Sequence, residues 1–508
     1  MENLSMLLRG FEIVFTVGNL AACVLGSILG IIVGAMPGIG SLAGVALLLP
    51  LTYAFHPTTA IIMLGALYYA NMYGGAFSAI LLNIPGDSPA VMTAVDGYPM
   101  ATKKGRPGQA LLTATSASCI GGTIGMMILT FAGPGLAQVG LRFGPAEMTA
   151  LLLMAMTSVG WLVGENPIKG IIVTLAGILL ASIGMDTLTG APRYHFGSIY
   201  LMGGIPFIPF VIGSVGFAQV MKLMASRNSA AQQVVEAKLT IRGSLFTKGE
   251  FMRLLFPSLR GGFLGTFVGV LPGAGATTGA FLGYAAQKAF KNKEPLGTGA
   301  VEGIAACESA NNAAAAGAFA PLLALGIPGS GTGAVLLGGL IMWGLNPGPL
   351  LFSKSPDFAW GCIASLYVAN IVTLVIAVSI IPILIKILSV PVKLIIPLVV
   401  VVCFVGSYTA VNSMYGIFVM LASGVAGYIL DRHKYPIAPM LLAFVLAPML
   451  EDNMRKALIT SGGSLSIFFV RPISLGFMVI FFVIILFPVV KAVLRRIKAR
   501  HHKDGGAL

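Results

Sequence analysis

Two short motifs join proline to glycine where an apolar segment is interrupted, and their backbone could bind an anion. GAMPGIGS spans residues 34–41, and GVLPGAGA follows 235 positions later at residues 269–276. Proline cannot continue a helix and glycine tolerates positive φ, so each motif predicts a helix break followed by a new helix start. A helix N-terminus carries about half a positive elementary charge and up to about four free N–H donors, which suit a carboxylate. The candidate substrate-binding residues in these motifs, or directly after them, are Pro37, Gly38, Gly40, Ser41, Pro272, Gly273, Gly275 and Thr277.

A second pair of breaks repeats in the same order. GAFSAILLNIPGDSPAV at residues 75–91 corresponds to GAFAPLLALGIPGSGTGAV at 317–335, and GIIVTLA at 170–176 corresponds to GIFVMLA at 416–422. The ordered matches indicate one duplicated unit with small insertions. Interrupted apolar segments at corresponding places of two halves point to the binding site of a secondary transporter. The candidate substrate-binding residues at these breaks are Asn83, Pro85, Gly86, Pro328, Gly329 and Ser330.

An acidic and amide-rich stretch, EGIAACESANN, interrupts otherwise apolar sequence further along. Glu308, Asn311 and Asn312 are spaced three and four apart, so they share one face of a helix. Ionisable groups inside a membrane are costly and usually line a pathway or contact an ion. We interpret these three residues and Ser309 as candidates for ion coupling. A cytoplasmic cap is the alternative, because the basic segment 288–294 lies just upstream.

Asp87 and Ser88 follow the first Ile-Pro-Gly break and leave two interpretations open. They could cap a helix that begins near Pro89, or Asp87 could coordinate the coupling ion together with backbone carbonyls. The string GDSPA superficially resembles the Gly-x-Ser-x-Gly of serine hydrolases. It lacks the closing glycine, the strand-to-helix context and a suitably placed histidine base. Hydrolysis is therefore disfavoured.

The elements that must position these residues are membrane helices. The chain is 57% hydrophobic and 9% charged over 508 residues, far from the composition of a soluble domain. Apolar windows of about twenty residues recur along it, which predicts an all-α polytopic membrane protein. We expect roughly 10–12 transmembrane helices plus broken or re-entrant half-helices, arranged as two inverted repeats.

Connector charges indicate the inversion. The loop at 56–59 has no Lys or Arg, whereas its counterpart from Lys288 onward has three lysines. Past the second break the bias reverses: the loop at 102–108 is basic, and 343–357 carries only Lys354. Equivalent loops should then face opposite sides of the membrane, because positive residues mark the cytoplasmic side. The expected organisation is a first transmembrane repeat at 11–224, a cytoplasmic connector at 225–255, a second repeat at 256–450, and a C-terminal span with a basic cytoplasmic tail at 451–508.

Several other classes of site are disfavoured. The net charge of +14 lies in short connectors beside apolar spans, which argues against nucleic-acid binding. Five cysteines stand singly without a CxxC pair, and five histidines form no ligand pair. We therefore expect free packed thiols, no cofactor, and no metal beyond Na⁺.

Together the motifs resemble one family, the large membrane subunit, TctA, of bacterial tripartite tricarboxylate transporters. The resemblance covers roughly Gly18–Leu458 and rests on MPGIGS, LPGAGA, ACESANNAAAAGAFAPLLALGIPGSGTGAVLLG and APMLEDNMRKAL. It implies a multi-pass secondary transporter of the bacterial inner membrane, driven by a cation gradient. It also implies two partners, a periplasmic solute-binding protein and a small membrane subunit. The family often has Pro where this chain has Cys307, and its substrates vary among carboxylates.

The sequence thus predicts a permease subunit that imports a tricarboxylate or related organic anion, with Na⁺ or H⁺ as the coupling ion, and not an enzyme. An anion channel is the alternative, but it would need a continuous polar stripe on several spans. An intramembrane enzyme would need a nucleophile–base pair or a metal triad. The sequence shows local breaks instead of either pattern.

Overall fold

The structure is a computed structural model that describes residues 2–36, 39–162, 167–186, 189–225, 244–246, 248–384 and 392–486. These residues are almost entirely helical and form two compact units, Met1–Leu141 with Ile205–Ile437 and Arg142–Gly204 with Ala438–Leu508. Both units draw on both halves of the sequence, so they do not coincide with the two expected repeats. Most of the expected connector, at 226–243 and 247, and the basic tail from 487 lie outside the described residues.

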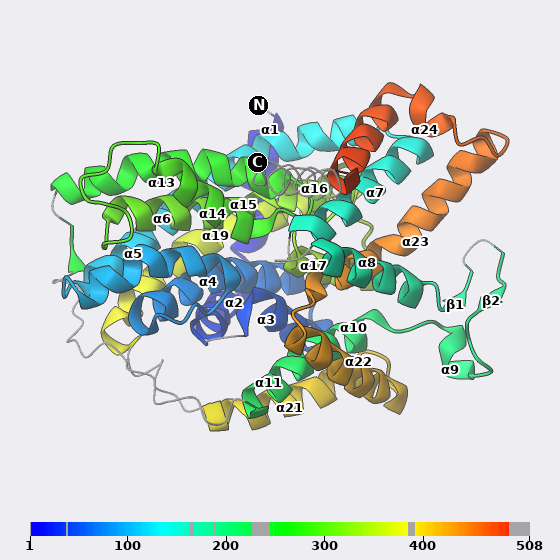
Figure 1. Ribbon diagram of the computed structural model, residues 1–508, viewed down its shortest axis with the longest axis horizontal. Helices are drawn as coiled ribbons and strands as arrows, with labels where there is room; N and C mark the ends of the chain where they lie inside the picture. Colours follow the sequence, from blue (N-terminus) through cyan, green and yellow to red (C-terminus); the bar gives the residue numbers. More distant parts are fainter. Residues whose placement is uncertain are drawn as a thin grey trace, which may run out of the picture. The chain divides into compact units, whose positions relative to one another are not determined.

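The first half of the larger unit contains a helix, a broken helical hairpin, a long central helix and a second break (Figure 1). Its elements are α1 (Glu2–Val14), α2 (Val17–Ala35), α3 (Gly40–Leu48), the 3₁₀ turn η1 (Leu49–Ala54), α4 (Pro57–Leu82), the 3₁₀ turn η2 (Ser88–Ala90), α5 (Val91–Thr102) and α6 (Pro107–Gly140).

The second half of this unit repeats this order of elements between residues 248 and 380. It contains α10 (Phe207–Val211), the π-helix η3 (Ile212–Phe217), α11 (Ala218–Ala225), α13 (Lys248–Val270), α14 (Gly275–Gln287), α15 (Val301–Gly317), α16 (Phe319–Leu325), α17 (Gly331–Met342), α18 (Leu351–Lys354), α19 (Pro356–Ile380), η4 (Ile381–Ile383), α21 (Val392–Thr409) and α22 (Met414–Arg432). Proline occupies the first turn of α4, α6 and α19, where its missing N–H costs nothing and its φ favours a helix start.

Packing of small residues confirms the duplication. Gly30 of α2 lies against the backbone of Leu67 in α4, and Gly265 of α13 lies against the backbone of Ala310 in α15. Gly265 follows Gly30 by 235 positions, as GVLPGAGA follows GAMPGIGS. Ala310 follows Leu67 by the number of residues that separates the two Ile-Pro-Gly breaks. A Cβ at either glycine would overlap the facing carbonyl oxygen, so close helix approach requires glycine in both repeats.

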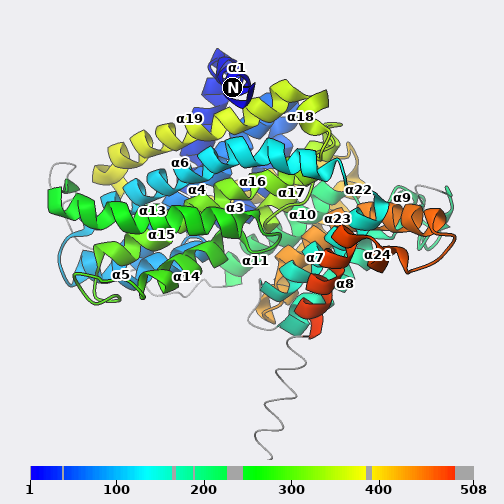
Figure 2. The same cartoon turned by 90° about the horizontal axis from the view of Figure 1, so that it is seen from above.

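The packing of one pair of equivalent helices supports the expected inversion of the repeats. Helix α4 and its counterpart α15–α16 cross with opposite chain directions, because residues later in α4 meet residues earlier in its counterpart. The Tyr68 ring lies 6.1 Å from the Phe319 ring, whereas Tyr73 lies within electrostatic range of Glu308. Figure 2 shows α4, α6, α13 and α15 running alongside one another.

The connector loops lie at opposite ends of α6, as the charge pattern predicts. At its start, Lys104 forms an ion pair with Glu294, which brings the two basic loops together. At its end, Gly140 packs against Pro349, inside the loop that carries few charges. Which side of the membrane each end of α6 faces stays a prediction.

The smaller unit contains α7 (Pro145–Leu162), α8 (Pro167–Ala181), the two-residue strands β1 (Gly184–Met185) and β2 (Pro192–Arg193), α9 (Ile199–Met202), α23 (Ile437–Thr460) and α24 (Ile467–Val470). The strands pair antiparallel, Gly184 with Arg193. Arg193 and Arg455 both pair with the buried carboxylate of Asp186, which fixes the hairpin to the end of α23.

Seven helices of the described residues are long and apolar enough to cross a membrane. Shorter apolar helices account for further segments, at 40–54, 167–181, 331–342, 396–409 and 472–486. The first and third of these are the half-helices that follow the predicted breaks. The protein is therefore an all-α, multi-pass membrane protein with interrupted helices.

Candidate functional site

The first break of each repeat has the same backbone geometry. Gly40 starts α3 with φ of 63° and Gly275 starts α14 with φ of 60°. Only glycine adopts this left-handed conformation without strain, so the glycine at this place in each motif is needed for the reversal of the chain. Beyond the turn, Gly44 packs back against Val33 of α2, which makes α2 and α3 a helical hairpin. Pro37 and Gly38 lie outside the described residues.

The second break is also equivalent in the two repeats. The C-cap of α4 is Asn83 and that of α16 is Gly326, both left-handed with φ of 55° and 70°. The next helical segments have Asp87 and Ser330 as N-caps in equivalent positions. Asp87 accepts a hydrogen bond from its neighbour's N–H, and the Ser330 hydroxyl accepts one from the Gly333 N–H at 3.1 Å.

Glycine allows the two breaks within each repeat to touch. A Cβ at Gly86 would overlap the carbonyl oxygen of Gly34, and a Cβ at Gly329 would lie 2.9 Å from that of Gly269. In the second repeat the Gly273 N–H also donates to the Gly329 carbonyl at 3.1 Å. Among the described residues, the two breaks of each repeat therefore lie against each other.

A set of polar side chains connects the breaks of the two repeats, and we call it the Asp87 cluster. The Asp87 carboxylate accepts from the Ser41 N–H at 3.1 Å and from the Asn71 amide at 2.8 Å. The Ser41 hydroxyl lies 3.1 Å from that of Thr332 in the second repeat. The Tyr68 hydroxyl lies 3.4 Å from that of Ser330. The cluster consists of Asp87, Ser41, Asn71, Thr332, Ser330 and Tyr68.

The predicted substrate residues at the breaks, and the ion-coupling candidates Asp87 and Ser88 beside them, differ in exposure. Asn83 and Ser88 are exposed, Asp87, Ser330, Pro85, Pro272 and Thr277 are half-buried, and Gly86, Gly273, Gly275, Pro328 and Gly329 are buried. The hydroxyl of Ser41 contacts Thr332, at the start of α17, and the N–H of Gly273 contacts Gly329. Direct facing of residues 38–41 and 273–277 across a substrate stays a prediction.

The ion-coupling candidates of α15 form a second polar region, which we call the Glu308 cluster. Glu308 is fully buried, and its carboxylate accepts from the hydroxyls of Thr93 in α5 and Ser118 in α6, the latter at 2.9 Å. Asn311 interacts with the same carboxylate. The Ser309 hydroxyl points elsewhere and donates to the Ser258 carbonyl. These residues lie in the interior of the larger unit, where α15 packs against α5 and α6.

Aromatic and amide groups from two further helices close this region. The hydroxyls of Tyr69 and Tyr73 in α4 donate to the Asn370 side-chain oxygen in α19, at 2.7 and 3.0 Å. The Asn370 amide donates to the Cys119 carbonyl and to the Thr123 hydroxyl. The Glu308 cluster consists of Glu308, Asn311, Asn312, Thr93, Ser118, Tyr69, Tyr73 and Asn370.

The charged end of α15 is held by structural interactions. Asp96 of α5 accepts from the N–H groups of Gly297, Gly299 and Ala300, so it holds the loop that leads into α15. Arg253 binds Glu302 through two hydrogen bonds of 2.7 and 2.9 Å. Glu302 is thus an ion-paired residue at the helix start, distinct from the unpaired carboxylate one turn and a half further on.

Glu294 in the same region is electrostatically stabilised. Its partial burial disfavours the charged form, but the hydrogen bond from Lys104 and the charges of Lys104 and Arg253 outweigh burial. They hold the pKa of the Glu294 carboxyl below its usual value.

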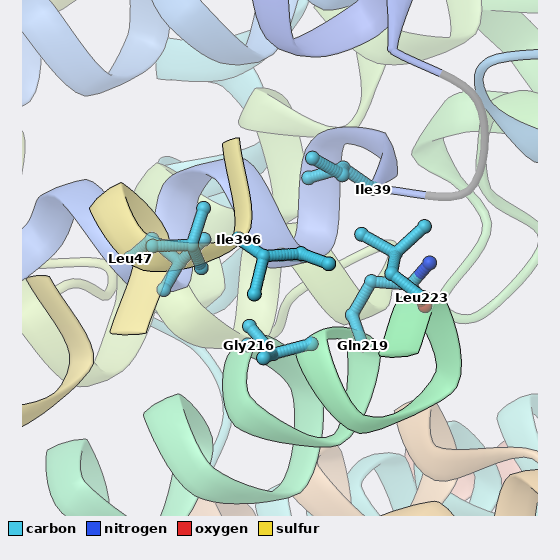
Figure 3. A pocket seen from close by; sticks show the side chains of 9 residues that line it. Ile39, Leu47, Gly216, Gln219, Leu223 and Ile396 are labelled. Atoms are coloured by element: carbon cyan, nitrogen blue, oxygen red, sulfur yellow. The ribbon is translucent and has the colours of Figure 1, made fainter. Parts of the chain in front are cut away.

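A small apolar cavity lies beside the half-helix α3 (Figure 3). Ile39, just before α3, and Leu47 within it face Gly216 of the π-helix η3, Gln219 of α11 and Ile396 of α21. Its volume is about 10 Å³, enough for about one water molecule. The cavity is therefore too small for a carboxylate substrate.

Sequence reasoning missed several members of both clusters. Tyr68 and Asn71 belong to a polar-aromatic patch that could equally have been packed or interfacial, and Thr332 lies two residues past a predicted one. Ser118 and Asn370 are isolated polar residues within long apolar helices. Such residues often hydrogen-bond across helices in membrane proteins. Their isolated position in an apolar helix was therefore the sequence feature that could have identified them.

Comparison with known proteins agrees with the repeated motifs. The profile described as "Tripartite tricarboxylate transporter TctA family" matches residues 20–442. A protein of Agrobacterium vitis described as "Uncharacterized 52.8 kDa protein in TAR-I ttuC' 3'region" is 38% identical over 478 residues, which cover 93% of this chain and 94% of that protein. A second, "Uncharacterized protein in TAR-II ttuC' 3'region", is 37% identical over 232 residues, which cover 45% of this chain and 96% of that protein. No solved structure matches the chain.

The family match covers most of the larger unit and includes both breaks of each repeat and the Glu308 stretch. The chain therefore belongs to the tripartite tricarboxylate transporter TctA family.

Proposed function

We propose that the chain is the permease subunit of a secondary transporter that imports a tricarboxylate or related organic anion across the bacterial inner membrane. A periplasmic solute-binding protein would deliver the substrate, and a small membrane subunit would complete the complex. A cation gradient, Na⁺ or H⁺, would drive accumulation. Membership of the family supports this proposal at the level of a tripartite transporter component.

One observation carries the assignment of the substrate site. In the first repeat the backbone N–H of Ser41, at the start of α3, already holds the carboxylate of Asp87. The residue equivalent to Asp87 in the second repeat is the neutral Ser330, whose hydroxyl caps α17 by accepting from the Gly333 N–H. The start of α14 therefore offers the same kind of backbone donors without an internal carboxylate among the described residues. We assign the substrate's carboxylate to this position, near Gly275 and Thr277.

A matched pair of substitutions tests this assignment. Ser330→Asp would place an internal carboxylate where the first repeat has one, and it should exclude the anionic substrate by occupation and like charge. Ser330→Asn has a similar size and no charge, so it should retain most uptake. Equal uptake by the two variants, at equal amounts in the membrane, would remove the substrate from this position.

Transport by the complete complex tests the function itself. Reconstituted vesicles should show saturable uptake that needs both the binding protein and a cation gradient. Flux that does not saturate would indicate the anion channel instead. Accumulation that persists without ATP after both Na⁺ and H⁺ gradients are collapsed would exclude secondary coupling.

A further inference from the structure

The Glu308 carboxylate has no cationic partner. The side chain is 0% exposed, and among the described residues no Lys, Arg or His pairs with it. Its neighbours Thr93, Ser118 and Asn311 are all neutral. A charge removed from water without a partner is unfavourable, so a positively charged ligand is expected beside this carboxylate.

The amides beside this carboxylate are also incompletely bonded. Asn311 is 1% exposed and its side-chain oxygen has no partner. Asn312 is 0% exposed. Its side-chain amide lies close enough to Tyr69 to interact with it, but neither its nitrogen nor its oxygen meets the geometric criteria for a hydrogen bond. Buried polar atoms are nearly always satisfied, so atoms without a partner on the same helix face as Glu308 point to a ligand.

The donor chemistry distinguishes between ligands. A proton on Glu308 would remove the charge but would leave the amide oxygens of Asn311 and Asn312 without a partner. A metal cation bound by oxygen would satisfy the carboxylate and both amides together. A single carboxylate balances a single positive charge, and oxygen ligands suit hard cations.

The two neighbouring hydroxyls fit the same ligand. Thr93 and Ser118 now donate to Glu308, but a hydroxyl can rotate and present its lone pairs to a cation. Asp87 differs, because backbone N–H groups of Ser41 and Ser88 hold its carboxylate and cannot become acceptors. Asp87 is therefore better suited to act as a cap.

We propose that Glu308, Asn311 and Asn312, with Thr93 and Ser118, bind one Na⁺ ion, and that this ion is the coupling ion. The second statement rests on the proposed transport function, whereas binding itself does not. The site joins α15 of the second repeat to α5 and α6 of the first, so ion binding would link the two repeats.

Thermal unfolding of the purified full-length protein in detergent tests the site without transport. Titration with NaCl, with choline chloride keeping ionic strength constant, should raise the Tm of the wild type in a saturable way, because a ligand of the folded state stabilises it. Glu308→Gln should lose this Na⁺ dependence while staying folded in choline. Asp87→Asn should keep the dependence, and Ser118→Ala should shift its midpoint to several-fold higher Na⁺ concentration.

Three results would overturn the site: no specific effect of Na⁺ on the wild type, an unchanged effect in Glu308→Gln, or loss of the effect only in Asp87→Asn. If Glu308→Gln does not fold, an unchanged midpoint in Ser118→Ala would count against the site. Na⁺ binding without Na⁺-driven uptake would contradict the transport role and leave the site intact. Na⁺-driven uptake without Na⁺-dependent stabilisation would contradict the site and leave transport intact.

Discussion

The hydroxyl of Ser41 lies 3.1 Å from that of Thr332, and this contact joins the first half-helix of one repeat to the last half-helix of the other. Both side chains are buried, at 6% and 5% exposure, so the contact is shielded from water. The inverted repeats thus meet through polar groups at the helix breaks, where the chain is least regular. Movement of one break should therefore be transmitted to the other.

A double-mutant cycle should detect this contact. Ser41→Ala and Thr332→Val should each lower the Tm, and the double variant should lose less than the sum of the single effects. The coupling free energy should be about 1 kcal/mol, typical of a buried neutral hydrogen bond. Thr130→Val, whose hydroxyl contacts Tyr367 instead, should combine additively with Ser41→Ala. Additive effects in the Ser41–Thr332 cycle would show that the hydroxyls are not coupled.

Replacement of Gly86 by alanine should destabilise the folded protein. In Gly86→Ala the new Cβ would overlap the Gly34 carbonyl oxygen and lie 2.8 Å from the Ser78 hydroxyl. Overpacking of this kind costs about 1–3 kcal/mol or more, so the amount of folded protein and its Tm should both fall. Gly18→Ala is the matched control, because nothing lies within 4 Å of its Cβ. Equal Tm values for the two variants would contradict the packing of the breaks.

The contribution of Glu294 to stability should depend on pH. Its folded-state pKa is lowered, chiefly by Lys104 against the opposing effect of burial. The stabilisation is therefore fully present above the unfolded-state pKa of about 4.3 and is lost as the pH falls through the folded-state value. Because the pair is partly exposed, the effect should stay below about 1 kcal/mol.

Glu294→Gln provides the measurement. The wild type should have the higher Tm near neutral pH, and the difference should shrink on acidification. A difference that grows as the pH falls would mean that the Glu294 carboxyl is not stabilised in its charged form.

Hydrophobic periodicity and the backbone chemistry of proline and glycine were sufficient to predict where the helices break. Proline removes a donor and glycine permits positive φ wherever they occur, so Gly40 and Gly275 could be predicted from residue type alone. Asp87 is an N-cap, which was one of two interpretations left open by the sequence, whereas the N-cap role of Ser330 was not predicted.

Tertiary partners were not predictable in the same way. Glu308 contacts Thr93 and Ser118, which come from helices far away in sequence and carry common residue types. Pairing of this kind depends on the rotation of each helix about its axis. In a helix that is apolar on all sides, hydrophobic periodicity gives no signal for that rotation. The compact units likewise depend on packing that the linear repeat does not encode.

The two exposed lysines Lys103 and Lys354 should be accessible from opposite sides of the membrane. Lys103 precedes the start of α6, and Lys354 lies in the loop that packs near the end of that helix. Single cysteines at these positions can be labelled with a membrane-impermeant maleimide in a variant without the native cysteines, four of which are buried and one half-buried. Lys354→Cys should be labelled in intact cells and Lys103→Cys only in inverted vesicles, because basic loops favour the cytoplasm. Detergent treatment, which removes the membrane barrier, is the control: a cysteine that stays unlabelled in detergent is unreactive in itself. Labelling of both positions from the same side would contradict the inverted arrangement of the repeats.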